Sequence, residues 1–572
     1  MGTSNRFTIN VLCALTFSLC ITQVLSGNKC ISQLGIRKQD DSSKSPYLRL
    51  ADGSYRSQTT FNTRMSPLSS LEVTPLVVTG MSSNRVDLVF FSDGYTGEEK
   101  AKFIDDARYL AEELSTNQTF NTVKPLMNFW AAFVPSRESG IGSHGHVKDT
   151  PFGLYRDGTE LRAVYAAYPE VAEFACMGML AQCNYPILLG NDPLYGGLGG
   201  RPTIITSSRM NGPQILRHEL GHSIIPVGEE YDGGFAYFGV NAYHDLKRPV
   251  PWAHHLTDPE NVRVERAIMP LQDYAWSMLN TTTPWKAKFE SSGMYARYLV
   301  RTSLSGLPKK EDLKVELDGK DLGWEPKAGL GVDRWLYDFY VDEPLDGGEH
   351  EVSFTLMNSE IEEQAQMCSV EVLEFGNEDE FTSTPGYYGV FPTFSEDNKT
   401  TYRPTNEDCL MRQVTTPNFC KVCLEGLWLA LLRRVSIIDY VIHRCDGKYN
   451  ALEVNLLPLA HLREEDTVEG ESYTIRWKRD GELLGKFANE TTIHVIGEEA
   501  LGTYELEVEF TTPEVVLDPM GRLKSKLEIY ITGRCDTRLQ SRGFLLDGYK
   551  EVVERGEPGQ MITKRLGRYL WL

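Results

Sequence analysis

The chain has 572 residues, of which 41% are hydrophobic and 24% charged, with a formal net charge of −21 at pH 7. One hydrophobic core rarely organises so long a chain, so we expect several domains. The negative charge argues against nucleic acid or an anionic membrane as the main partner, because both reward basic surfaces. The composition is otherwise that of an ordinary globular protein.

Residues 1–26 have the layout of a secretory signal peptide: one basic residue, Arg6, then an apolar run, then small residues. An uncleaved membrane anchor is the alternative, but polar residues interrupt the run, and no later segment is long and apolar enough to span a bilayer. Four N-x-[ST] sequons agree with secretion; they begin at Asn117, Asn280, Asn398 and Asn489. We therefore expect a secreted glycoprotein, extracellular or associated with the cell wall.

Residues 27–81 form a weakly patterned N-terminal segment. From residue 82 onward, apolar strand patterns at 86–96, 128–136 and 185–190 flank a predicted helix at 97–114. The apolar positions of that helix recur at helical spacing; they are Phe103, Ile104, Ala107, Leu110 and Leu114. The alternation of strand and helix predicts an α/β layer over 82–290.

Two later regions alternate apolar and polar residues between Gly and Asp turns. Residues 291–385 therefore predict an inserted β-sandwich, and residues 446–535 predict a second, C-terminal one. Trp477 and Tyr504 give the second region an immunoglobulin-like pattern, although no cysteine pair accompanies them. Residues 386–445 are assigned back to the α/β layer, and 536–572 form a C-terminal tail.

Eleven cysteines are present, and nine remain after the signal peptide. An odd number predicts a free thiol or an intermolecular bridge. Cys176 with Cys183, and partners among Cys409, Cys420 and Cys423, are candidate local disulfides. The "FCKVC" spacing is also found in zinc and redox sites, but in a secreted chain we expect a disulfide.

The segment "HELGHSIIPVGEEY" (218–231) carries the chemistry. On a helix, His218 and His222 project from one face, and Glu219 lies about 100° further round. This H-E-x-x-H pattern predicts two zinc ligands and a general base. The alternative is a pair of structural histidines. A third ligand is expected from Glu229 or Glu230, of which only one should face the ion on an extended segment.

The helix itself is well signalled. Asn211 is a candidate N-cap and Pro213 falls in the first turn, while Pro226 and Gly228 follow the last turn.

"RHELGHSIIPVGEEYDGG", "VDLVFFSDGYT", "NDPLYGGLGG" and "YRPTNEDCLM…FCKVC" together resemble the IgA-metallopeptidase family, in particular its fungal secreted branch. The resemblance covers residues 82–290 and 386–440. It implies a zincin-like (metzincin-like) catalytic domain with a five-stranded sheet and an active-site helix. By the same resemblance the ligands are His218, His222 and Glu230, which it favours over Glu229, with Glu219 as the base. Met411 would be the methionine beneath the metal.

The resemblance and the motif together predict a secreted zinc endopeptidase that cleaves peptide or protein substrates. Tyr231 and Tyr237 are candidate stabilisers of the oxyanion. The glycine-rich stretch 192–200 is either an edge that holds a peptide backbone or a surface loop.

Two other functions stay open. The first is an adhesion or scaffold protein with a structural or vestigial zinc site, and the second is a zinc hydrolase of non-peptide amides. The pairs His144/His146 and His254/His255 are not expected to bind metal, and the sequence does not indicate an oligomeric state.

Overall fold

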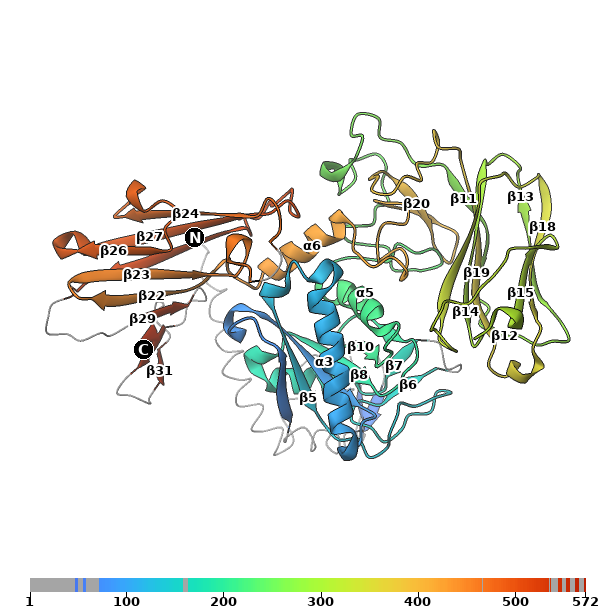
Figure 1. The fold of residues 1–572 in the computed structure, drawn as a ribbon, viewed down its shortest axis with the longest axis horizontal. Coiled ribbons are helices and arrows are strands. Elements are labelled where there is room, and N and C mark those ends of the chain that lie inside the picture. Colours follow the sequence, from blue (N-terminus) through green and yellow to red (C-terminus); the bar gives the residue numbers. More distant parts are fainter. Residues whose placement is uncertain are drawn as a thin grey trace, which may run out of the picture. The chain divides into compact units, whose positions relative to one another are not determined.

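The computed structural model describes residues 47–49, 55–57, 71–157, 163–464, 467–533, 535, 544–547, 552–555, 561–564 and 570–571 (Figure 1). Contacts divide the chain into two units, Met1–Leu71 and Glu72–Leu572. In the first unit, β1 (Tyr47–Arg49) pairs antiparallel with β2 (Tyr55–Ser57). The predicted signal peptide lies outside the described residues. In the part of the chain that the structure describes, no helix combines the length and apolarity needed to cross a membrane.

A six-stranded mixed sheet forms the base of the α/β domain. In spatial order its strands are β3 (Glu72–Val77), β5 (Met127–Phe133), β4 (Val86–Asp93), β8 (Tyr185–Gly190), β10 (Thr203–Thr206) and β9 (Gly197–Leu198). The four central strands are parallel, and the two edge strands run antiparallel to their neighbours. Every residue of β4 is buried, which explains the apolar run from Leu88 to Phe91 at its centre. A hairpin, β6 (Leu154–Arg156) with β7 (Val164–Ala166), lies between β5 and β8 in sequence.

This sheet has six strands where the resemblance implied five, and it starts before the predicted boundary at residue 82. The additional strand is β3, which contains Pro75. A proline within a strand pattern confines it to a sheet edge, and β3 is an edge strand paired only with β5. The apolar pattern used for the central strands therefore missed it.

Four α-helices belong to this domain: α3 (Lys100–Thr116), α4 (Pro169–Gly178), α5 (Gly212–Ile224) and α6 (Lys421–Leu432). The predicted helix at 97–114 corresponds to α3, which buries Phe103, Ala107, Leu110 and Leu114. Helix α5 packs against α3, α6 and β10 (Figure 1). The sequence-distant helix α6 thus returns to the first layer, as predicted for residues 386–445.

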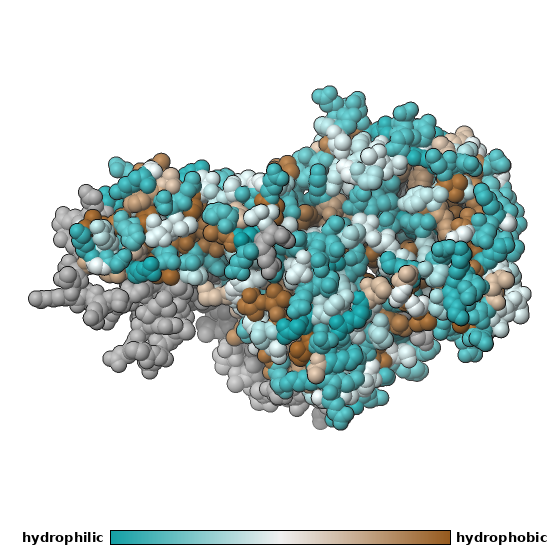
Figure 2. All heavy atoms as spheres, viewed as in Figure 1, coloured by the Kyte–Doolittle hydropathy of each residue, from teal (hydrophilic) through white to brown (hydrophobic). Residues whose placement is uncertain are grey.

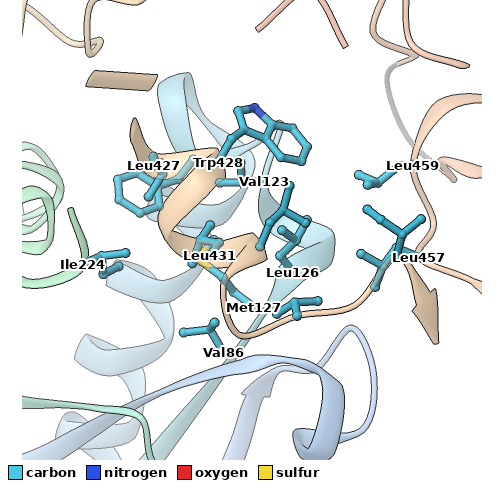
Figure 3. Close-up of a cluster of buried hydrophobic side chains, with 14 of the residues drawn as sticks. Val86, Val123, Leu126, Met127, Ile224, Leu427, Trp428, Leu431, Leu457 and Leu459 are labelled. Atoms are coloured by element: carbon cyan, nitrogen blue, oxygen red, sulfur yellow. The ribbon is translucent and has the colours of Figure 1, made fainter. Parts of the chain in front are cut away.

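The contact between α6 and the sheet domain is apolar. Figure 3 shows Leu427, Trp428 and Leu431 of α6 in one cluster with Ile224 of α5 and Val86 of β4. Between the inserted sandwich and α6, β20 (Phe391–Phe394) and β21 (Thr400–Arg403) form a hairpin. The residues between this hairpin and α6, 404–420, are called the return segment here, and they include Leu410 and Met411, which contact α5.

The inserted β region consists of two sheets. Its first strand begins at Ala267 and its last strand ends at Phe375, whereas the sequence predicted bounds of 291 and 385. One sheet contains β11 (Ala267–Asp273), β12 (Ser277–Met278), β19 (Gln366–Phe375), β14 (Arg297–Ser305) and β17 (Trp335–Val341). The other contains β13 (Trp285–Ser291), β18 (Gly348–Leu356), β15 (Leu313–Leu317) and β16 (Lys320–Asp321). The early start was missed because β11 contains Pro270 at a register shift, which disguises it as a loop.

The C-terminal sandwich also starts earlier than residue 446. One sheet contains β22 (Ile438–Asp446), β23 (Tyr449–Leu456), β26 (Thr492–Ile496), β29 (Phe544–Asp547), β30 (Val552–Arg555), β31 (Met561–Lys564) and β32 (Leu570–Trp571). The other contains β24 (Ser472–Arg479), β25 (Glu482–Leu483), β27 (Gly502–Thr511) and β28 (Lys524–Ile531). Trp477 and Tyr504 are fully buried in this domain. The expectation that no cysteine pair accompanies them is wrong, because Cys445 and Cys535 form a disulfide.

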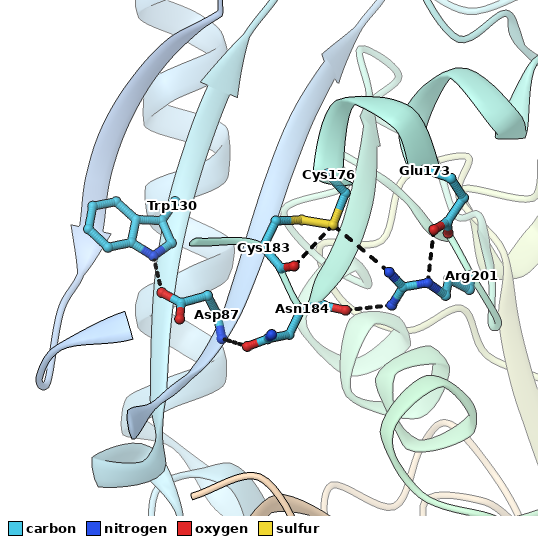
Figure 4. Close-up of a disulfide and its surroundings, with 7 residues drawn as sticks. All are labelled: Asp87, Trp130, Glu173, Cys176, Cys183, Asn184 and Arg201. Carbon is cyan, nitrogen blue, oxygen red and sulfur yellow. Dashed lines mark hydrogen bonds and ion pairs between the residues drawn. A yellow bond between two sulfur atoms is a disulfide. The ribbon is translucent and has the colours of Figure 1, made fainter. Parts of the chain in front are cut away.

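The predicted disulfide between Cys176 and Cys183 is confirmed. It joins the end of α4 to the residues that lead into β8, and Figure 4 shows Arg201 beside it, bonded to Glu173 and to the carbonyl of Asn184. In the view of Figure 2, most of the described surface is hydrophilic with scattered apolar side chains, which fits the high charge of the chain.

Candidate active site

Helix α5 presents the histidine pair. Pro213 lies in its first turn, as predicted, and the helix ends where Ile225 takes an extended conformation. Asn211 precedes the helix, but its side chain does not cap it: the amide donates to Asp333 at 2.7 Å. His218 and His222 then lie one turn apart on the helix, with His218 almost fully buried.

The two imidazoles converge through their Nε2 atoms, which are 3.2 Å apart. Each ring uses its other nitrogen elsewhere: His218 Nδ1 lies 3.1 Å from the carbonyl oxygen of Leu410, and His222 Nδ1 lies 3.2 Å from that of Val227. A carbonyl only accepts, so these contacts place a proton on each Nδ1 and leave the Nε2 lone pairs free. This is how metal-binding histidines are usually oriented.

Glu229, and not Glu230, completes this group. Its carboxylate oxygens lie 3.3 Å from His218 Nε2 and 3.0 Å from His222 Nε2. Glu230 points to the opposite side of the chain, where its Oε1 accepts from Asn241 at 2.9 Å. The preference for Glu230 as third ligand is therefore corrected. Neighbouring side chains of an extended segment point opposite ways, and backbone bonds of Glu229 to Ala236 and of Glu230 to Met411 set which one faces the histidines.

The three donors fit a zinc ion. In a tetrahedral site with Zn–N and Zn–O bonds of about 2.0–2.1 Å, ligand atoms lie roughly 3.3 Å apart. The distances among His218, His222 and Glu229 are 3.0 to 3.3 Å.

The electrostatics favour a cation at the same place. Burial alone would lower the pKa of His218, but Glu229 outweighs it and raises that pKa to about 9. Burial alone would raise the pKa of Glu229, but the two imidazoles lower it to about 2.

Glu219 lies beside this group, with a carboxylate oxygen within 4.8 Å of both imidazole nitrogens. Burial raises its pKa, against the lowering effect of the two histidines and of a bond from the Gly199 backbone. Strand β9 and the residue after it pass close to Glu219, because a Cβ at Gly197 would lie 3.0 Å from Glu219 Cγ and a Cβ at Gly199 would lie 3.0 Å from Glu219 Oε2. A carboxylate with a raised pKa, placed one water molecule away from the donor group, can accept and return a proton.

The return segment lies beneath α5. A Cβ at Gly221 would be 3.2 Å from Met411 Sδ, so the sulfur lies directly against the helix between the two histidines. Leu410 holds His218 through its carbonyl, and the carbonyl of Met411 accepts from the Glu230 N–H at 3.0 Å. Met411 thus lies where the family resemblance predicts a methionine floor.

The two predicted tyrosines differ in orientation. The Tyr237 hydroxyl accepts from the Gly234 N–H at 2.8 Å and donates to the Tyr231 carbonyl at 3.0 Å, so it is engaged in shaping its own loop. The Tyr231 ring stacks on His218 with centroids 6.4 Å apart. Burial, followed by the charges of Glu229 and Glu219, raises the Tyr231 pKa. Only Tyr231 therefore faces the histidine group.

Sequence reasoning missed a contribution from the inserted sandwich. Asp333 accepts from the Tyr195 N–H at 2.7 Å, just before β9, and from Asn211 at the start of α5. The guanidinium of Arg334 lies 5.0 Å from the centroid of the Tyr195 ring. These residues are more than 120 positions apart in sequence, and no local pattern indicates the contact.

The other predicted pairs have separate outcomes. His144 and His146 lie on an exposed loop, as expected. Adjacent side chains such as those of His254 and His255 were predicted to point apart, but both Nε2 atoms approach Glu425 Oε2, at 2.6 and 3.2 Å. Glu425 also accepts two backbone N–H groups of the C-terminal domain, so this cluster links two parts of the chain.

The prediction of a disulfide among Cys409, Cys420 and Cys423 is wrong. Cys409, Cys420 and Cys423 are unbonded and buried, and they lie with Glu230 in one group.

One comparison with known proteins matches the part of the chain that carries the histidine pair. Residues 74–294 match the family model described as IgA Peptidase M64, a span that includes α5 and Glu229. No curated protein matches the chain.

Solved structures with similarity include a beta-glycosidase from Bacteroides vulgatus (10% identity, 49% of this chain, 27% of that chain, TM-score 0.10). Another is a GH2 beta-galacturonidase from Eisenbergiella tayi bound to glycerol (11% identity, 49% of this chain, 37% of that chain, TM-score 0.09). The chain thus spans well under half the length of these structures, and such scores support no argument about fold or activity.

Proposed function

We propose, from the match of residues 74–294 to the model of the IgA Peptidase M64 family, that the protein is a secreted zinc endopeptidase. The observation that carries the proposal is the convergence of His218, His222 and Glu229 beside Glu219, under the edge strand β9. The fungal branch and the route of secretion remain predictions from the sequence.

His218, His222 and Glu229 would hold the metal. Zinc bound there supplies a water of lowered pKa and polarises the scissile carbonyl. Glu219 then takes the proton of the attacking water and passes it to the leaving amine. Its burial suits this exchange, because a raised pKa brings a carboxylate nearer to the working pH.

Strand β9 supports a peptide substrate. It is the edge of the sheet, paired on one side with β10, so its other side offers backbone groups to an extended peptide. Its glycines serve the approach of β9 to α5, because a Cβ at Gly197 would lie 2.4 Å from Ile215. The stretch 192–200 therefore works as an edge held close to Glu219.

Tyr231 is the residue we assign to the oxyanion. Its ring lies over His218 and its hydroxyl bonds to Glu229 beside the histidine pair, whereas the phenol of Tyr237 bonds within its own loop. A phenol donating to the developing negative charge would stabilise the transition state.

The decisive experiment compares Glu219→Gln with the surface control Glu349→Gln. We expect Glu219→Gln to retain zinc and its fold but to lose peptide cleavage by about 10²–10⁴-fold, the usual contribution of a general base. Glu349 is exposed in an ion pair with Lys288, and its replacement should leave cleavage unchanged.

Unchanged cleavage in Glu219→Gln would exclude this mechanism, and an intact protein with no cleavage in any variant would favour the scaffold alternative. A peptide library left uncut, while small amides are hydrolysed, would favour the non-peptide hydrolase. Secretion is tested separately: the N-terminus of the exported protein should begin just after Ser26.

A further inference from the structure

A second group of metal-type side chains lies on the other side of the Glu229–Glu230 segment. We propose that it is a structural zinc site with four ligands: Cys409, Cys420, Cys423 and Glu230. This site would hold the segment that carries Glu229, and only that last consequence rests on the proposed function.

The distances are those of a tetrahedral zinc site. With Zn–S of about 2.3 Å and Zn–O of about 2.0 Å, two sulfurs lie roughly 3.8 Å apart, and a sulfur and an oxygen roughly 3.5 Å. The Sγ atoms of Cys409 and Cys423 are 3.8 Å apart, and Cys423 Sγ is 3.6 Å from Glu230 Oε1. The ligand atoms of all four residues lie within 4.8 Å of one another.

Burial leaves a group in need of a partner. Glu230 is fully buried, and its Oε2 has no hydrogen-bond partner. Removing a carboxylate oxygen from water without a partner costs about 1–3 kcal/mol or more. A cation among the three sulfurs accounts for this arrangement, because it binds the carboxylate and the thiolates together.

The donor chemistry selects zinc over harder cations. Thiolates are soft ligands. A site with three thiolates and one carboxylate disfavours calcium and magnesium, because both ions prefer oxygen ligands. Cys420 and Cys423 have the C-x₂-C spacing at the start of α6, where the positive end of the helix dipole stabilises thiolates.

Surrounding residues orient the ligands as in established metal sites. Asn241 donates to Glu230 and also to the carbonyl of Gly228, which fixes the carboxylate against its own strand. The Cys420 N–H donates to Cys409 Sγ at 3.4 Å. The buried guanidinium of Arg403 acts electrostatically on Glu230 and offsets part of the negative charge of four ionised ligands.

A disulfide is the competing use of these cysteines, and the geometry disfavours it. Three thiols can form only one disulfide, which would leave the third thiol outside it and would provide no partner for the buried Oε2 of Glu230. The structure joins Cys176 to Cys183 at 2.01 Å, whereas Cys409 and Cys423 stay at 3.8 Å.

The site would connect the two halves of the catalytic domain. Cys409 lies two residues before Met411, whose carbonyl accepts from the Glu230 N–H. Glu230 follows Glu229, so a metal that fixes Glu230 also fixes the direction of Glu229 toward the histidines. Loss of the second zinc should therefore weaken metal binding at the first site.

Metal content of the purified full-length protein tests the proposal. We expect two zinc ions per chain in the wild type, one in the double variant His218→Ala/His222→Ala, and none when Cys420→Ser is added to it. Cys368→Ser is the matched control, since Cys368 is also buried and outside any disulfide but lies in β19 of the inserted sandwich; this variant should keep two zinc ions.

Cobalt gives an independent readout. Co²⁺ in the cysteine site should show sulfur-to-metal charge-transfer absorption, retained in the histidine double variant and lost in Cys420→Ser. If the cysteine variant does not fold, the wild type and the histidine variant still decide the question.

The proposal is overturned if the histidine double variant holds no metal while the wild type holds one, or if non-reducing peptide mapping shows a disulfide between two of the three cysteines. If instead the peptidase proposal fails, the wild type and the histidine double variant should each hold one zinc ion. Both proteins should then show the sulfur-to-metal band when cobalt replaces zinc, so the two failures are distinguishable.

Discussion

Arg412 lies at the centre of a buried ion-pair network beneath the candidate active site. Its side chain is fully buried, and it pairs with Asp232 and with Glu407, the latter at 3.2 Å. It also donates to the carbonyl of Glu230 at 3.0 Å. Arg412 follows Met411 directly, so these bonds connect the return segment to the extended segment that carries Glu229.

We predict that Arg412→Met destabilises the catalytic domain by about 3–4 kcal/mol. Removing one partner of a buried pair costs about 3–5 kcal/mol. The lower part of that range applies because Glu407 keeps Arg301 at 2.9 Å, and Asp232 keeps the Phe394 N–H at 2.8 Å. Asp232, which is fully buried, loses the cation with which it pairs.

Thermal unfolding measures the effect. For a domain of about 200 residues, each kcal/mol lowers Tm by about 2–4 °C, so a fall of about 6–16 °C is expected. Arg433→Met is the matched control: Arg433 is exposed just after α6, and its loss should change stability by no more than about 0.5 kcal/mol.

The double variant Asp232→Asn/Arg412→Met separates charge from packing. If the loss comes from an unpaired buried carboxylate, removing that charge as well should restore at least half of the stability. A single variant within 2 °C of the wild type, or a double variant no more stable than the single one, would refute the reasoning.

Three further predictions concern the same region. Glu229→Ala should remove one zinc per chain under mild chelation that spares the wild type, as measured by metal analysis. Gly221→Ala should destabilise the protein by about 1–2 kcal/mol, measured by denaturant unfolding. The new Cβ would lie 3.2 Å from Met411 Sδ, and this overpacking outweighs the gain in helix propensity. Gly178 has open space around it, so the control Gly178→Ala should be neutral or stabilising. Burial alone would raise the pKa of Glu407, but the neighbouring guanidiniums lower it to about 2. Its stabilising effect is therefore complete above about pH 4.5 and lost as the pH falls toward 2, so the stability gap between wild type and Glu407→Gln should shrink over that window.

The sequence by itself determined the chemistry of α5. An H-E-x-x-H pattern on a helix places two imidazoles on one face because the helix repeats every 3.6 residues, and no tertiary contact is needed for that conclusion. The buried central strands could also be predicted from the sequence, because parallel strands that are covered on both faces consist mainly of apolar residues. The β-sandwiches followed from period-2 alternation, although a strand that contains proline, β11, hid the start of the inserted one.

Only the tertiary structure decided which acidic residue meets the histidines. Alternation along an extended segment says that Glu229 and Glu230 face opposite ways, but it does not say which faces α5. That choice depends on backbone bonds to Ala236 and to Met411, the second about 180 positions away.

The cysteine group follows the same logic. Cys409, Cys420 and Cys423 look like disulfide partners in a secreted sequence, and only folding brings Glu230 among them. Contacts between residues far apart in the chain leave no periodicity in the sequence, so ligand sets assembled from several segments become visible only in three dimensions.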